Sequence, residues 1–309
     1  MIWAHCWCGY SHINRYIYLF HMPLFFYVSG MFIKGLDLND AISKYAKRLL
    51  IPYAITSILT LLVLLTLAQI ICMPVDKIVI NWIKRTLFAS AQPGSEFLAQ
   101  FDFVGPIWFL FGMFWSCTFY SYLKNKYSGI TLWGFSLVLF ALASISIKGI
   151  RLPFSIQAGM GGVLLLQIGQ FIKENDLLVK VKMLPKSLVL LMSLTILVLG
   201  WNTGLNIGIL NYPFGLTSLF VSIIISILLI NTVQVMKVFN KWGGYGRYTL
   251  QILCSHSIAW NIFHILGNPF CELTQYQIIN LGLEFVFQIT FAVLGTIILS
   301  KTPFIKRMF

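Results

Sequence analysis

The five histidines are the residues of this 309-residue chain whose type and spacing could carry chemistry. An imidazole gains and loses a proton near neutral pH, so it can serve as a general base on a hydroxyl group. His5 and His21 form the clearest pair, because a turn centred near residue 13 places each of them eight residues from that centre. They would then lie at the same depth on adjacent antiparallel helices.

The histidines also have a structural interpretation, in which a ring hydrogen-bonds a neighbouring carbonyl and holds two helices together. We favour that interpretation for His12, which falls in the turn, and for His264, near the end of its apolar segment. For His256, which lies between two serines in mid-segment, a structural and a functional role have equal weight. The matched placement of His5 and His21 favours a catalytic pair.

A basic cluster of Lys44, Lys47 and Arg48 stands at the start of an apolar segment. Such cations anchor membrane spans at the cytoplasmic surface and contact anionic lipids. Lysine and arginine also bind phosphate, so the cluster is a candidate site for the phosphates of a cytoplasmic donor. The sequence is compatible with both interpretations.

Other reactive groups are scarce in the apolar segments. Glu284 is the one clear carboxylate there, which argues against a proton-coupled carrier and against hydrolysis by paired carboxylates. The six cysteines lack the spacing of a metal site, and we expect them to be free thiols that pack between helices. No metal is therefore predicted.

The composition requires a membrane as the solvent of the folded chain. Hydrophobic residues make up 58% of it and charged residues 10%, and the mean hydropathy is +0.83. These values exclude soluble domains, a disordered chain and a nucleic-acid-binding protein. We predict an all-α polytopic transmembrane bundle, a single membrane domain over residues 1–309, in which residues 1–8 are the C-terminal stub of a first span. The nine full spans that follow are 16–33, 52–73, 105–122, 130–147, 153–172, 187–201, 213–233, 248–266 and 276–299.

Loop charges predict the orientation in the membrane. If the loops alternate between two sides, 16 of the 22 Lys and Arg residues fall on one side and 6 on the other. The positive-inside rule places the richer side, with the C-terminus, in the cytoplasm. The net charge of +13 then reflects topology rather than an anionic ligand.

Three local patterns add to this outline. Residues 77–90 resemble an amphipathic helix lying on the outer face, because isoleucine and leucine are spaced between lysine and arginine. Residues 202–212 form an uncharged outer loop suited to a turn or to hydrogen-bonding a polar ligand. Gly159, Gly161 and Gly162 are expected to let neighbouring helices approach closely.

The string FHMPLFFYVSG, from Phe20 to Gly30, resembles a hallmark of the membrane acyltransferase-3 family, in its branch of sugar O-acetyltransferases similar to fucose 4-O-acetylase. Further stretches agree with that family in order along nearly the whole chain, although Leu253 stands where the family usually has tyrosine. These stretches are Ala4–Cys6, Arg48–Tyr53, Gly105–Leu110, Gln167–Gln170 and Gly246–His256.

The resemblance implies a multi-pass O-acetyltransferase of the bacterial plasma membrane. Its donor would be acetyl-CoA or a related acyl-CoA from the cytoplasm. Its acceptor would be a hydroxyl of a sugar or polysaccharide near the outer face. Membrane lipid would surround the protein, and no metal or nucleic acid would take part.

The resemblance also assigns roles to single residues. His5 matches the histidine taken as the family's catalytic group, and His21 matches the histidine of the second helix. Arg48 matches a basic residue suited to contact the donor phosphates. Trp108 and His256 match positions that we expect around the central cavity. We expect His5 to act as general base on the acceptor hydroxyl or to carry the acyl group briefly, with His21 orienting it.

Two further expectations concern completeness and alternatives. The family's first helix has a charged residue well before its histidine, whereas this chain begins four residues before His5, so the resemblance implies a chain truncated at its N-terminus. A transporter or flippase of a lipid-linked saccharide is the main alternative, although the paired halves with broken helices typical of transporters are not visible. The other alternative is a paralogue with a decayed active site.

Overall fold

The computed structural model describes residues 2–6, 11–95, 98–200, 205–212, 215–236, 243–271 and 273–301. Over these residues the chain is helical apart from turns and connections, and one isolated bridge pairs Asn206 with Asn211. The predicted all-α class is therefore confirmed for the described part of the chain.

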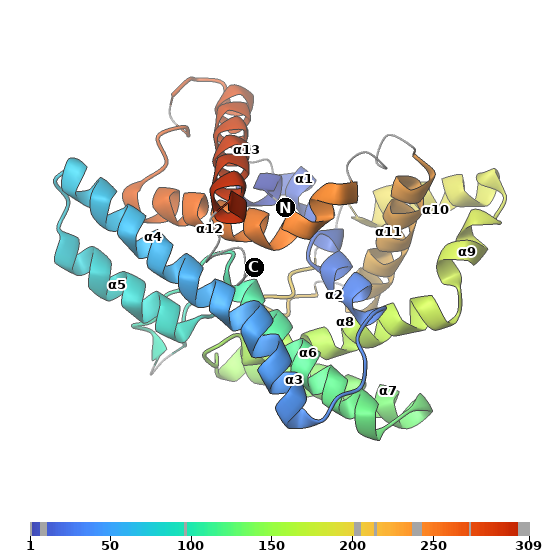
Figure 1. The fold of residues 1–309 in the computed structure, drawn as a ribbon. Helices are drawn as coiled ribbons and strands as arrows, with labels where there is room; N and C mark the ends of the chain where they lie inside the picture. Colours follow the sequence, from blue (N-terminus) through green and yellow to red (C-terminus); the bar gives the residue numbers. More distant parts are fainter. Residues whose placement is uncertain are drawn as a thin grey trace.

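The helices pack into one bundle, and the connections 89–107, 201–215 and 267–276 are longer than the others (Figure 1). The elements η1 and η5 are 3-10 helices, and η2 is a π-helix that joins α3 to α4. The bounds are η1 (Ile2–His5), α1 (Ser11–Phe20), α2 (Pro23–Gly30), α3 (Leu38–Tyr45), η2 (Ala46–Leu50), α4 (Ile51–Ile70), α5 (Val75–Phe88), α6 (Trp108–Lys126), α7 (Gly129–Gly149), α8 (Ile156–Glu174), α9 (Leu177–Lys182), α10 (Lys186–Gly200), α11 (Leu216–Val235), η5 (Gly243–Tyr248), α12 (Thr249–Leu266) and α13 (Gln277–Lys301).

Each of the nine predicted spans coincides with helical structure, but the segment 16–33 is not one continuous helix. It divides at residues 21–22 into α1 and α2. The cause is Pro23, which has no N–H to donate to the carbonyl four residues earlier and whose ring crowds that carbonyl. Proline is well tolerated at the first position of a new helix, where it stands in α2. His21 therefore lies in a turn rather than inside a helix.

Among the described residues, four helices are long and apolar enough to cross a membrane: Leu38–Ile70, Gly129–Gly149, Leu216–Gln234 and Gln277–Lys301. Only 22% to 39% of the most apolar window of each is buried inside the protein. Their apolar side chains thus cover much of the outer surface, as expected for a protein surrounded by lipid. The remaining helices at predicted spans are shorter or less apolar, and the count of nine spans stays a prediction.

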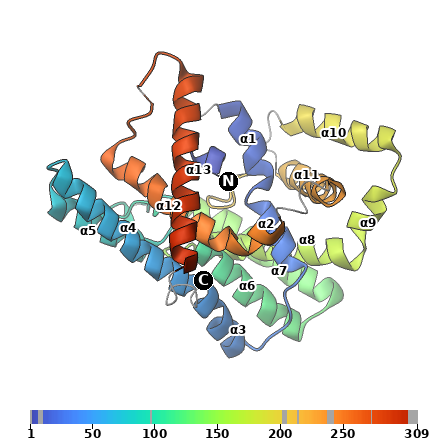
Figure 2. The same cartoon turned by 45° about the horizontal axis from the view of Figure 1, so that its top comes forward.

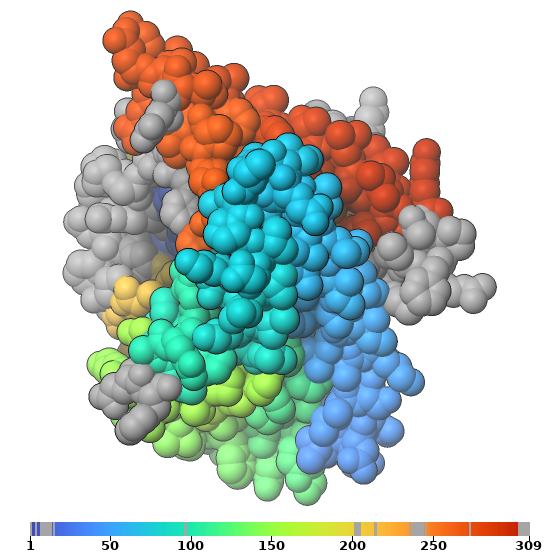
Figure 3. Space-filling model, turned by 90° about the vertical axis from the view of Figure 1, so that its left-hand side faces the viewer, coloured from blue at the N-terminus to red at the C-terminus, as the bar shows by residue number. Residues whose placement is uncertain are grey.

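The helices form groups that are visible from two directions. Helices α6, α7 and α8 lie side by side, while α12 crosses the centre of the molecule and α13 crosses α12 at a steep angle (Figures 1 and 2). Helices α4 and α5 pack against each other and cover one side of the bundle, with α12 and α13 beside them (Figure 3). Helix α12 therefore stands between the N-terminal helices and the C-terminal one.

Glycines allow α8 to approach both α2 and α6. A Cβ added at Gly159 would lie 2.4 Å from the Cβ of Trp115 on α6, and one added at Gly162 would lie 2.3 Å from Ser116 Oγ. A Cβ at Gly169 would lie 2.0 Å from the Tyr27 carbonyl oxygen on α2. The predicted close approach of neighbouring helices at the glycines of this segment is confirmed.

The predicted outer segments also have defined structure. Helix α5 is present where residues 77–90 predicted a helix, and its Trp82 Nε1 donates a hydrogen bond to the Ser57 carbonyl oxygen of α4 at 2.9 Å. The described part of the 202–212 loop forms a turn closed by two backbone hydrogen bonds of 3.0 Å between Asn206 and Asn211. Its position on the outer face of a membrane stays a prediction.

The sequence predicted that all six cysteines are free thiols, and this prediction is wrong. Cys271, in the connection between α12 and α13, is disulfide-bonded. Disulfides persist in oxidising surroundings outside the cytoplasm, and this connection is one that the loop charges place outside. Cys8 lies outside the described residues, and the free thiols are Cys6, Cys72, Cys117 and Cys254.

Candidate active site

A small cavity, which we call the histidine pocket, contains His5 and His21 in its wall and has a volume of about 140 Å³. Helix η1 supplies His5, and the turn between α1 and α2 supplies His21. The remaining wall comes from α1 and the turn that follows it, the connection between α5 and α6, the start of α6, helix α12 and the loop near Asn206. Its residues are Tyr18, Met22, Ala91, Phe103, Gly105, Pro106, Trp108, Leu205, Asn206, Ile207, Leu253 and Trp260.

The rings of His5 and His21 meet edge to face, with centroids 5.9 Å apart. The ring of Tyr18, one helical turn before His21, lies 4.7 Å from the His21 ring and 6.3 Å from the His5 ring. The predicted adjacency of the two histidines is therefore present, but the turn predicted near residue 13 is wrong. Residues 11–20, which include His12, form α1, and His21 lies in the turn that follows this helix. The catalytic role of His5 and His21 stays a prediction.

A backbone hydrogen bond fixes the orientation of the His21 ring. Its Nδ1 lies 2.9 Å from the Ile17 carbonyl oxygen. A carbonyl can only accept, so this contact requires the proton on Nδ1 and leaves a lone pair on Nε2. His21 is 4% exposed, and its Nε2 has no hydrogen-bond partner among the residues that the structure describes. A buried imidazole nitrogen with an unused lone pair can take the proton of a hydroxyl that enters the pocket.

His256 lies behind His5 rather than in the wall of the pocket. It is fully buried, and its ring centroid is 5.4 Å from that of His5. Gln288 of α13 lies beside it and donates a hydrogen bond of 2.9 Å to the buried carboxylate of Glu284. The structure thus places His256 next to the predicted catalytic histidine but not among the lining residues of the cavity.

Trp108 lines the histidine pocket, as expected for a residue of the central cavity, and Trp260 and Phe103 line it as well. The Trp260 ring stacks on His264 at 4.9 Å and lies 5.6 Å from the Phe103 ring. These aromatic rings give the pocket flat apolar surfaces around its few polar groups, an arrangement typical of small-molecule sites.

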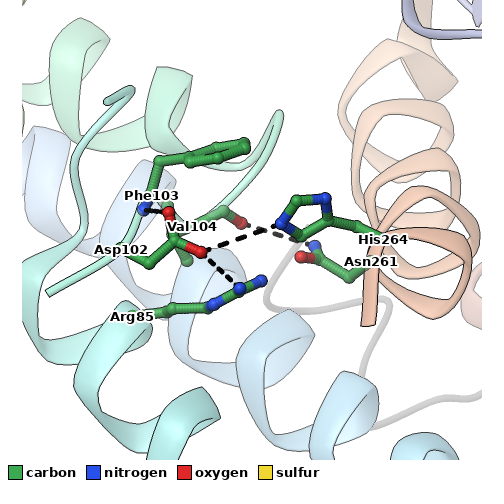
Figure 4. Close-up of polar contacts among 6 residues, drawn as sticks. All are labelled: Arg85, Asp102, Phe103, Val104, Asn261 and His264. Atoms are coloured by element: carbon green, nitrogen blue, oxygen red, sulfur yellow. Dashed lines mark hydrogen bonds and ion pairs between the residues drawn. The ribbon is translucent and has the colours of Figure 1, made fainter. Parts of the chain in front are cut away.

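A polar network holds the aromatic rim in place, with Asp102 between Arg85 and His264 (Figure 4). Asp102 forms an ion pair with Arg85, and its carboxylate lies 3.8 Å from His264 Nε2. Burial lowers the pKa of Arg85, and the neighbouring Asp102 opposes that effect. Asn261 donates to the Val104 carbonyl oxygen at 3.4 Å and so ties α12 to the segment before α6. The structural role predicted for His264 agrees with these contacts.

A second and larger cavity, which we call the cationic pocket, has a volume of about 440 Å³. Lys44, Arg48 and Arg247 are in its wall. Within the part of the chain that the structure describes, none of these three side chains is paired with a carboxylate. Unpaired cations around one cavity make a binding site for an anion such as phosphate.

Helical spacing explains which members of the predicted basic cluster reach this cavity. Lys44 and Arg48 are four residues apart, so they lie on the same helical face. Lys47 lies one position away from Arg48, is exposed, and is not in the wall of the pocket. The structure therefore brings two of the three predicted donor-site cations together and leaves the third outside.

The rest of the cationic pocket is mostly apolar. Helix α2 contributes Phe25 and Val28, and α6 contributes Phe109 and Met113. The two cavities adjoin, because Leu253 of α12 is in the wall of both. One end of the combined space thus carries cations and the other end carries imidazoles, with apolar surface between them.

Several site residues were not identified from the sequence. Tyr18 lies three residues before His21, and this helical spacing could have placed it on the same face. Arg247 belongs to the stretch Gly246–His256 that resembles the family, but its charge was counted only as a topology signal. Trp260 comes from a remote segment, and nothing in the local sequence connects it to His5. Asn206 lies in the 202–212 loop, which the sequence indicated as suited to hydrogen-bonding a polar ligand.

The comparisons with known proteins give one match. The model of the acyltransferase-3 family, described as an acyltransferase domain, matches residues 1–301, which is nearly the whole chain. Neither the comparison with curated proteins nor that with solved structures gives a match.

Proposed function

We propose a reaction from the premise that the chain belongs to the acyltransferase-3 family. A membrane acyltransferase of this kind would move an acetyl or similar acyl group from acyl-CoA, bound in the cationic pocket, to a sugar hydroxyl in the histidine pocket. The observation that carries the proposal is the contact of the two cavities at Leu253, with unpaired cations on one side and two adjacent histidines on the other.

The donor end suits a coenzyme with phosphates on an otherwise extended arm. Lys44, Arg48 and Arg247 would hold the phosphates by charge-assisted hydrogen bonds. The apolar walls from α2 and α6 would hold the arm that ends in the thioester. Lys44 and Arg247 lie in segments that the loop charges place in the cytoplasm, where acyl-CoA is available.

The acceptor end suits a neutral polar molecule. Trp108, Trp260 and Phe103 offer flat surfaces for the apolar face of a sugar ring, and the Asn206 amide offers a donor and an acceptor. Asn206 and Phe103 lie in segments that the loop charges place outside. A cell-envelope glycan would therefore meet the pocket from its own side of the membrane.

The proposed reaction needs only the thioester, the acceptor hydroxyl and an imidazole that transfers one proton. The acceptor hydroxyl attacks the thioester carbonyl, a C–O bond forms, the C–S bond breaks, and coenzyme A leaves as thiolate. An imidazole of His5 or His21 takes the hydroxyl proton and returns it to the sulfur. In the alternative route the acyl group passes first to an imidazole nitrogen of His5 and then to the hydroxyl oxygen. A positioned general base typically contributes a rate factor of about 10²–10⁴.

The test follows the acyl label. Membranes that contain the protein should transfer radiolabel from acetyl-CoA to glycan, and the glycan should gain the mass of one acetyl group. His5→Ala and His21→Ala should each lower this transfer by about 100-fold or more, while the protein accumulates in the membrane at the wild-type level.

Three results would contradict the proposal in different ways. Unchanged transfer by His5→Ala would remove His5 from the mechanism. Movement of a lipid-linked saccharide without any acyl donor would favour a flippase. No transfer of label from any acyl-CoA would leave the decayed paralogue as the better account.

A further inference from the structure

Leu253 lies between the two cavities and borders both of them. Its side chain is 3% exposed and is in the wall of both the histidine pocket and the cationic pocket. Within the walls defined by the described residues, the two cavities share this one residue. The side chain of Leu253 on α12 therefore borders both the predicted donor end and the predicted acceptor end.

Three helices run from one cavity to the other. On α12, Leu250 faces the cationic pocket and Trp260 the histidine pocket, with Leu253 between them at helical spacing. At the start of α2, Met22 faces the histidine pocket, and Phe25, nearly one turn later, faces the cationic pocket. Along each of these two helices, the side chains thus pass from the wall of one cavity to the wall of the other.

Helix α6 shows the same change between consecutive residues. Trp108 faces the histidine pocket, and Phe109 faces the cationic pocket. The Phe109 ring lies 5.7 Å from the Phe25 ring, so these two helices close one side of the junction with aromatic rings. Leu253, which borders both cavities, has a smaller and more flexible aliphatic side chain than these two aromatic residues.

We propose that Leu253 determines which acyl groups can be transferred. This inference rests on the proposed function, because a thioester held from the cationic side must reach the histidines at this junction. The acyl group then lies against Leu253, where the histidine pocket adds only about 140 Å³ that the acceptor also needs. An acetyl group leaves Leu253 in place, whereas each further methylene competes with its side chain for the same space.

The experiment measures transfer from acetyl-, propionyl- and butyryl-CoA by purified protein in lipid nanodiscs. Leu253→Ala should raise the ratio of kcat/KM for butyryl-CoA over acetyl-CoA by at least about tenfold, since one methylene in an apolar pocket is worth roughly 10–200-fold. Leu253→Trp should lower transfer from all three donors by a similar or larger factor. Binding of radiolabelled acetyl-CoA to Leu253→Trp should stay within about twofold of wild type, because the cations that hold the donor are unchanged.

Matched variants separate the inference from general damage to the helix. Ile252→Ala removes a similar side chain from the neighbouring position of α12, which is in neither wall, and should leave the donor ratio unchanged. Leu253→Val removes one methylene and should shift the ratio for propionyl-CoA in the same direction. This variant decides the matter if Leu253→Ala does not accumulate.

The possible failures are distinguishable. Absence of transfer from every donor in the wild-type protein would overturn the proposed function together with this inference. Wild-type transfer with the same donor ratio in Leu253→Val, Leu253→Ala and Ile252→Ala would overturn the role of Leu253 alone. A parallel loss of donor binding and transfer in Leu253→Trp would also overturn it, since the residue would then act on binding.

Discussion

The hydrogen bond from His21 Nδ1 to the Ile17 carbonyl affects how the roles of the two histidines are divided. The sequence suggested that His5 is the base and His21 its orienting partner. In the structure the His21 ring is itself oriented by the backbone and keeps an unused Nε2 in a buried position. We therefore expect both His5→Ala and His21→Ala to lose transfer, and a clearly larger loss in His21→Ala would favour its Nε2 as the atom that receives the proton.

The donor site gives a prediction at the scale of single charges. Arg48→Ala should raise the apparent KM for acyl-CoA by about tenfold, because a hydrogen bond to a charged group contributes about 1.5–3 kcal/mol. Arg247→Ala should act in the same direction. The KM for the acceptor should change much less. Initial-rate kinetics with each substrate varied in turn provide the measurement.

Lys47 provides the matched control for this prediction. It carries the same charge as its neighbour and lies outside the cationic pocket, so Lys47→Ala should leave both KM values near those of wild type. If Lys47→Ala and Arg48→Ala had the same effect, the basic cluster would act as a membrane anchor instead.

At the scale of elements, prolines distort the backbone at both ends of the site. Pro23 ends α1 and places His21 in a turn. Pro52 stands four residues after Arg48, where it cannot donate to the Arg48 carbonyl, and the π-helix η2 lies there. Single turns of π-helix occur frequently at functional sites. His21 and Arg48 thus both lie where the backbone hydrogen bonding of a regular α-helix is interrupted.

The packing of α2 on α8 gives a prediction of stability. Gly169→Ala would push α2 away from α8, because the added Cβ would lie 2.0 Å from the Tyr27 carbonyl oxygen. Overpacking of this kind costs about 1–3 kcal/mol. The variant should therefore unfold at a lower temperature than wild type in the same detergent, and its acyl transfer should fall because α2 also carries Phe25.

Gly134 of α7 is the matched control, because nothing lies within 4 Å of a Cβ added there. Gly134→Ala should unfold at the wild-type temperature or slightly above it, since alanine favours the helix. Equal losses in the two variants would show that the close contact of α2 with α8 does not limit stability.

The sequence predicted the helices better than it predicted which of them meet at the candidate site. Long apolar runs predicted the helices. The turn predicted near residue 13 is wrong, because residues 11–20 form α1, yet His5 and His21 still lie close together. The sequence could not show that α2, α6 and α12 all contribute to the wall of one cavity, since this depends on packing between remote segments. Trp260 and Arg247 were missed for this reason, and Lys47 was included because adjacency in sequence does not determine the helical face.

At the scale of the whole molecule, the two cavities should open towards opposite sides of the membrane. The predicted outer side includes the disulfide-bonded Cys271 and the free, exposed Cys72 at the end of α4. In intact cells a membrane-impermeant maleimide should label Cys72 without any reductant, and Cys72→Ser should abolish that signal. Cys271 should become reactive only after reduction.

Labelling of Cys72 only in permeabilised cells would reverse the orientation. The cationic pocket would then face away from the cytoplasmic supply of acyl-CoA. The assignment of donor and acceptor ends would have to be exchanged or abandoned, whereas the helices and both cavities would be unaffected.

The place of Leu253 in the walls of both cavities has a consequence beyond acyl transfer. A passage open at both ends would admit water and carry protons down the electrochemical gradient that the host cell maintains. Leu253 would then block the passage of water and protons as well as determine the choice of acyl donor. A Leu253 variant that accepts larger donors should therefore also let protons cross the membrane.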